Sequence, residues 1–88
     1  MEVAELARIT ATLVGAIAEA KVRAKEYGID PEFREIVRHA REMHFLLLEA
    51  LLANKTLATE YYRGLVDSTD NSIEQLEALA ELPDGKMQ

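Results

Sequence analysis

Two histidines and the carboxylates around them are the residues of this sequence whose types and spacing could do chemistry. Glu35, His39 and Glu42 follow one another at i, i+4 and i+7, so a helix would carry all three on one face. A carboxylate–imidazole set of this kind can bind a metal ion. Helical di-iron sites, however, take Glu-x-x-His pairs from two helices, and neither His39 nor His44 follows a glutamate by three residues. The sequence therefore predicts a solvated polar face, with no metal and no cofactor.

The same segment contains an Arg-x4-His spacing from Arg34 to His39, and a spacing one residue longer from Arg38 to His44. The first spacing resembles that of the helical HEPN ribonucleases, and the resemblance implies an RNA-cleaving site. Charged helices often contain such spacings by chance, and the chain is shorter than that family. Its acidic balance is also unsuited to an RNA surface. The spacing alone does not predict a ribonuclease.

Lys21 and the run from Asp30 to Glu35 (Asp-Pro-Glu-Phe-Arg-Glu) resemble the helical chorismate mutases. In that family a lysine late in the long first helix precedes an Asp-Pro-x-Arg-Glu run. Here an extra residue stands before Arg34, which turns it and Glu35 by ~100° around a helix. Arg8 is the only arginine among the first twenty residues, so the charges that would neutralise a dianionic substrate are missing. A capped helix start explains the run better.

A series of carboxylates lies near the C-terminus, and no lysine or arginine interrupts it between residues 66 and 85. Five of them recur at i+3 or i+4 and would share one helix face. We call this set the acidic ridge: Asp67, Asp70, Glu74, Glu77 and Glu81. Most such faces are simply solvated. The alternative is a docking strip for a basic protein partner, or a mimic of nucleic acid.

The composition narrows the classes of function. Sixteen acidic and ten basic side chains give a net charge of −6, which disfavours nucleic acid and anionic membrane surfaces because both require a cationic footprint. The first residues lack the basic region of a secretory signal. The longest apolar stretch, 45–53, is too short to cross a bilayer and contains Glu49. We therefore expect a soluble cytoplasmic protein with neither nucleic acid nor membrane as a partner.

Helices must position all of these residues, because apolar residues keep the helical period from Phe33 to Ala80 without losing phase. A first helix is expected over about residues 3–27, ended by Gly28 in a left-handed conformation. Asp30 and Pro31 have the types of an N-cap and a first-turn proline. A second helix should therefore start at residue 31 and, after so short a connection, pack antiparallel to the first.

The sequence leaves open where the second helix ends. Residues 54–56 (Asn-Lys-Thr) offer a cap without Gly or Pro, so the helix either stops near 53 or continues to about 66. The polar run 67–72 is a second weak point. The last helix is expected over about 56–82 or 72–82, with 83–88 as a tail. The predicted fold is all-α: an antiparallel helical hairpin, extended to a bundle of three helices or four segments, in one domain spanning 1–88.

Two apolar surfaces exceed what three helices of one chain can cover. On the first helix, a face of small residues lies nearly opposite the main apolar face and comprises Ala11, Gly15, Ala18 and Val22. It is either an exposed surface of good helix formers or a second packing face, and Val22 favours the latter. On the second, 45–52 is apolar around almost the whole circumference. The residues that we expect at an interface in this segment are Phe45, Leu48 and Leu52. Small cores commonly depend on disulfides, metals or oligomerisation, and the chain has no cysteine, so we predict a homo-oligomer, most simply a dimer.

These features predict a non-enzymatic protein–protein interaction module that acts as an adaptor, a regulator or an assembly subunit. No residue is assigned a catalytic role. The alternative is a small helical enzyme or ligand-binding oligomer with a pocket between subunits. Its first candidate residues would lie toward the hairpin connection, and they are Lys21, Arg34, Glu35 and His44.

Overall fold

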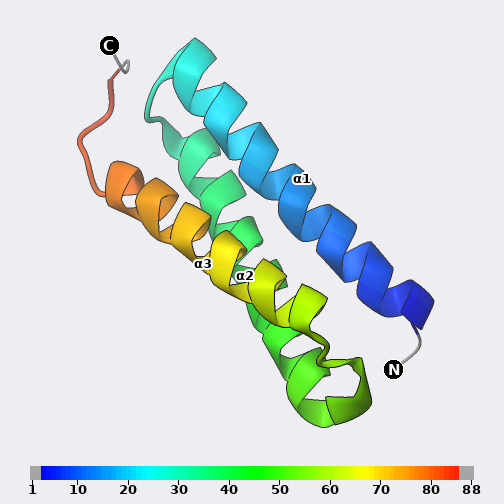
Figure 1. Ribbon diagram of the computed structural model, residues 1–88. Coiled ribbons are helices and arrows are strands. Elements are labelled where there is room, and N and C mark those ends of the chain that lie inside the picture. The colour runs from blue at the N-terminus through cyan, green and yellow to red at the C-terminus, as the bar shows by residue number, and fades with distance from the viewer. Residues whose placement is uncertain (1–2, 86–88) are drawn as a thin grey trace.

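The computed structural model describes residues 3–85 and contains three α-helices: α1 (Val3–Tyr27), α2 (Pro31–Ala53) and α3 (Glu60–Ala80). A single 3-10 turn, η1 (Lys55–Leu57), joins α2 to α3. Figure 1 shows α1 and α2 as an antiparallel hairpin, with α3 crossing α2 on its way back toward the hairpin connection. The all-α, three-helix class predicted from the sequence is confirmed.

The hairpin connection consists of residues suited to helix ends. Gly28 has a φ of 83°, a left-handed conformation that glycine adopts without strain, and its N–H donates to the Ala24 carbonyl at 3.0 Å. The Asp30 carboxylate accepts a hydrogen bond from the Phe33 N–H at 2.8 Å, and Pro31 occupies the first helical position. The connection is therefore short and rigid, which explains the antiparallel packing of α1 and α2.

Asp30→Ala is expected to destabilise the fold, because the Phe33 N–H loses its cap and Arg23 loses the ion pair that it forms with Asp30 at 2.8 Å. The hydrogen bond from Arg23, and then that from the Phe33 N–H, hold the pKa of Asp30 below its ordinary value. A lowered carboxyl pKa contributes stability that is present at neutral pH and is lost as the pH falls through the folded-state pKa. Denaturation curves from pH 7 to pH 2 should therefore show the variant and the wild type converging in acid.

Asp30→Asn is the matched control, since asparagine keeps the cap but not the charge. It should be more stable than Asp30→Ala and show a weaker pH dependence than the wild type. A stability difference between Asp30→Ala and the wild type that stays constant down to pH 2 would contradict the assigned ion pair.

The break between α2 and α3 follows Ala53. The Asn54 backbone N–H donates to the Ala50 carbonyl at 3.0 Å, and its side-chain amide donates to the same oxygen at 3.4 Å. Thr59 then caps α3 by accepting a hydrogen bond from the Tyr62 N–H at 3.5 Å. Of the two alternatives that the sequence leaves open, the chain breaks near residue 53 and does not continue to 66. The break turns α3 back onto α2, where it buries apolar residues instead of overhanging the hairpin.

Helix α3 runs without interruption through the polar run 67–72. The last helix therefore begins at Glu60 and not at Ser72, and the bundle has three segments and not four. Two hydroxyls of the run are satisfied inside the helix, because Ser68 Oγ and Thr69 Oγ1 donate to the Leu65 carbonyl at 3.2 and 2.6 Å. Because these hydroxyls form hydrogen bonds within the helix, they do not interrupt it.

The core lies between α1 and α2 and beneath α3. Its largest fully buried side chains are Leu6, Leu13, Phe33, Leu47 and Ile73. The bundle measures 44 × 19 × 15 Å, and its radius of gyration of 14.0 Å exceeds the ~12 Å of a compact domain of this length. Its surface of 5735 Å² likewise exceeds the ~5200 Å² usual for a folded monomer of this mass. The elongated shape leaves apolar side chains uncovered.

The segment after α3 returns to the hairpin connection. Gly85 and Ile29 exchange two backbone hydrogen bonds, of 2.6 and 3.2 Å. The Arg34 guanidinium donates to the Ala80 and Leu82 carbonyls at 3.1 and 3.0 Å. These contacts fasten the end of α3 to the start of α2.

Candidate interaction surface

Large apolar side chains are exposed at the open end of the bundle, where α2 stops and α3 begins. Leu52 is 75% exposed and Phe45 is 55% exposed, and the half-buried Leu48 lies between them. Spacings of three and four residues place the three on one side of α2. We call them the apolar strip. The single chain leaves the strip largely uncovered, and its role as an interface remains a prediction.

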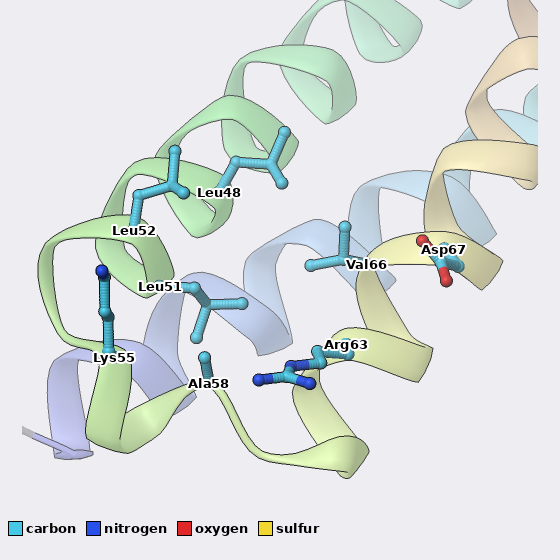
Figure 2. Close-up of a pocket in the computed structure, with 8 residues that line it drawn as sticks. All are labelled: Leu48, Leu51, Leu52, Lys55, Ala58, Arg63, Val66 and Asp67. Atoms are coloured by element: carbon cyan, nitrogen blue, oxygen red, sulfur yellow. The ribbon is translucent and has the colours of Figure 1, made fainter.

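A groove lies beside the apolar strip, between the end of α2 and the start of α3. Its volume is about 510 Å³, and Figure 2 shows leucines of α2 on one side and Val66 and Arg63 of α3 on the other. Most of the lining is apolar. Three charged residues also line it, Lys55, Arg63 and Asp67, and none of them forms an ion pair within residues 3–85. The groove is thus apolar with charges of both signs at its edge.

The small-residue face of α1 points away from the core. Ala11, Gly15, Ala18 and Val22 are all exposed, Val22 to 54%. A Cβ atom at Gly15 would meet no other atom within 4 Å. Glycine inside a helix costs about 1 kcal/mol relative to alanine, and no packing within the single chain offsets that cost. The outer side of α1 is therefore open to close approach by another helix.

The acidic ridge is divided by an arginine from α2. The Arg41 guanidinium forms ion pairs with Asp70 and Glu77, both at 2.8 Å. The hydrogen bond from Arg41 is the main cause that lowers the pKa of Asp70. Two of the five ridge carboxylates thus hold α3 against α2. The other three are exposed and form no ion pair within residues 3–85: Asp67, Glu74 and Glu81.

His44 is a buried histidine with both ring nitrogens near polar groups. Its Nε2 lies 3.0 Å from the Val66 carbonyl, which can only accept, so Nε2 carries the proton and donates it. Nδ1 is then the acceptor and lies 3.4 Å from Arg41 Nη1. His44 therefore links α2 to α3.

Three of the four residues proposed for an enzyme or ligand-binding site are engaged in separate contacts. Arg34 holds the segment after α3, Glu35 pairs with Arg38, and His44 bonds to α3. Lys21 is exposed on α1. Of the two residues in the Arg-x4-His spacing, Arg34 is hydrogen-bonded to the end of α3 and His39 is exposed.

Within residues 3–85, no three His, Asp or Glu side chains are placed so that they could hold a metal ion. In the same range, none of the helices has both the length and the apolar character required to span a bilayer. Comparison with known protein families, with curated proteins and with solved structures gives no match. The function must therefore be inferred from the surfaces of this chain.

Sequence reasoning missed Arg41 and two of the three charges of the groove, Lys55 and Arg63, while Asp67 was named only as part of the acidic ridge. A signal for Arg41 exists in the spacing: Arg34 and Arg41 are seven residues apart on α2, and Asp70 and Glu77 are seven apart on α3. Matching spacings on two antiparallel helices would pair Arg34 with Glu77 and Arg41 with Asp70. In the structure Arg41 takes both carboxylates and Arg34 pairs with Asp84, so the spacing indicates complementary charge but not the partners. The sequence spacing gives no indication that Lys55 belongs to the groove. Lys55 lines the groove together with Arg63 and Asp67 because the chain breaks after Ala53 and turns back.

Proposed function

We propose that this chain is a non-enzymatic protein–protein interaction module that works as a homo-oligomer, most simply a two-fold dimer. The observation that supports this best is the apolar strip, which is exposed beside an apolar groove at one end of the bundle. Exposed apolar surface costs about 25 cal/mol per Å², and patches edged by charge commonly mark association sites. A partner that covers the strip would recover this free energy.

The outer face of α1 supports the same proposal independently. Small side chains let a second helix backbone approach closely, so that van der Waals contact is made along several turns. Gly15 has a cost within the single chain and no packing role in it. Close packing of a second helix against this face would offset the free-energy cost of Gly15.

The proposal also includes a second, basic protein as partner, which would make the chain an adaptor, a regulator or an assembly subunit in the cytoplasm. The exposed ridge carboxylates and the net charge of −6 favour cationic partners over nucleic acid or membrane. Binding through such exposed charges should weaken as the salt concentration rises.

Wild-type protein is expected to be a dimer whose melting temperature rises with protein concentration. Gly15→Leu should block close helix approach, and Leu52→Glu should place a charge in the proposed interface. Leu52→Glu should shift the mass measured by light scattering toward the 9.9 kDa of one chain and remove the concentration dependence, and Gly15→Leu should do the same if the outer face of α1 also pairs.

Both variants should remain folded, since Gly15 faces open space and Leu52 is largely exposed. Circular dichroism checks this. Gln75→Leu is the matched control, because Gln75 is exposed on α3 and lines neither the groove nor the small-residue face of α1. It should leave the dimer intact. A wild-type chain that is monomeric at ~100 μM and melts independently of concentration would refute the proposal.

A further inference from the structure

We propose that the groove between α2 and α3 is the surface on which two copies of this chain pair, with their α3 helices antiparallel. The two-fold axis would pass near Leu48 on α2 and between Arg63 and Asp67 on α3. This inference rests on the proposed homo-oligomer. It adds the surface, the identity of the partner and the register of the pairing.

Charge complementarity favours a second copy over a different partner. In a two-fold interface the same patch occurs on both sides, so it must be complementary to itself. Arg63 and Asp67 carry opposite charges, line the same groove, and stand four residues, about 6 Å, apart on α3. Antiparallel pairing places Arg63 of each copy opposite Asp67 of the other. Neither residue has an ion-pair partner within residues 3–85, so both charges are available.

The apolar strip has the same symmetry. Phe45 and Leu52 lie three residues before and four residues after Leu48 on one side of α2. Rotation about an axis that crosses α2 between positions 48 and 49 places Phe45 of each copy opposite Leu52 of the other. The two most exposed large apolar side chains of α2 would thus cover each other above the groove. The apolar and the charged parts of the patch therefore require one and the same axis.

The remaining charge of the groove is also consistent with this pairing. Lys55 lies at the end of the groove remote from the acidic ridge (Figure 2). The antiparallel rotation directs Lys55 of each copy toward the ridge of the other, where opposite charges attract. A stable interface buries about 800 Å² per partner, roughly one seventh of the 5735 Å² surface of the chain.

Charge exchange tests the register. Arg63→Glu places glutamate opposite Asp67 twice in the dimer, and Asp67→Arg places arginine opposite Arg63 twice. Each single variant should weaken the dimer roughly tenfold or more at low salt. An equimolar mixture of the two should form a dimer with one copy of each variant, because both cross-pairs are then attractive. Native mass spectrometry distinguishes this mixed dimer by its mass.

The double variant Arg63→Glu/Asp67→Arg should also pair with itself, which shows that the substitutions do not prevent folding. Gln75→Glu and Gln75→Arg are the controls, since they introduce charge at an exposed position of α3 that does not line the groove, and they should leave the dimer unchanged. If both single variants remain dimeric as wild type does, the inference is wrong while the proposed homo-oligomer stands on another surface. If they dissociate but the mixture does not associate, the antiparallel register is wrong. A monomeric wild type overturns both.

Discussion

Phe33→Ala is expected to lower the free energy of unfolding by about 3–5 kcal/mol, whereas Phe45→Ala should change the stability of the single chain by less than about 0.5 kcal/mol. Phe33 is fully buried between the helices, so its truncation leaves a cavity that the surrounding side chains fill incompletely. Phe45 is 55% exposed, and its removal leaves no enclosed cavity. Urea denaturation at a protein concentration low enough to populate monomer measures both changes.

The chain contains only these two phenylalanines. The same substitution at both positions therefore compares a buried with an exposed side chain of one type. A loss of 3–5 kcal/mol is a large share of the ~5–15 kcal/mol that stabilises a small domain. Phe33→Leu, which removes less volume, provides a variant that stays folded. Phe45→Ala should instead weaken self-association in light scattering. Equal losses of stability at the two positions would show that Phe45 belongs to the core of the single chain.

The part of the fold that the sequence predicts correctly is the part specified by neighbouring residues. Gly28 ends α1 in a left-handed conformation, and Asp30 and Pro31 start α2, within a span of four residues. Each effect depends on backbone geometry at that position and not on distant parts of the chain. Residue types alone therefore locate the hairpin connection and the antiparallel packing of α1 and α2.

The path of the second half could not be chosen from the sequence, because it depends on tertiary contacts. Residues 54–56 permit a helix as well as a break, and packing of α3 against α2 decides between them. The run 67–72 contains residues that favour helix ends, yet it stays helical while Thr69 is buried. Arg41 contacts Asp70 and Glu77, which lie 29 and 36 residues further along the chain. Local preference does not reveal pairings at that separation.

In the candidate site, too, the sequence predicts the features of single helices but not those that depend on contacts between helices. An all-round apolar segment predicts exposed side chains on any single bundle, and Phe45 and Leu52 are exposed. Four of the five residues of the acidic ridge lie within α3 and Glu81 is its C-cap, but the sequence does not show that Arg41 takes two of the five carboxylates. The groove itself joins residues from α2, the connection and α3. Its charge pattern becomes visible only once the break has brought these elements together.

Arg41→Ala is expected to lower the free energy of unfolding by about 2 kcal/mol, since hydrogen bonds to charged groups contribute about 1.5–3 kcal/mol and both carboxylate partners stay partly hydrated. The Arg41 side chain is only 20% exposed and joins α2 to α3 through Asp70 and Glu77. Arg38→Ala is the matched control. Arg38 lies on the same helix, is exposed, and pairs only with its neighbour Glu35 among the described residues, so its loss should cost less than about 0.5 kcal/mol.

The pH dependence of the two variants separates a cross-helix ion pair from simple loss of packing. Arg41 holds the pKa of Asp70 below its ordinary 3.8, so the pair contributes stability that is present at neutral pH and is lost as the pH falls through the lowered pKa. In Arg41→Ala the pKa of Asp70 returns toward its ordinary value. Denaturation between pH 7 and pH 2 should therefore show the difference between wild type and Arg41→Ala shrinking below about pH 4. A difference that persists undiminished in acid would mean that the alkyl chain of Arg41, and not its charge, stabilises the contact between α2 and α3.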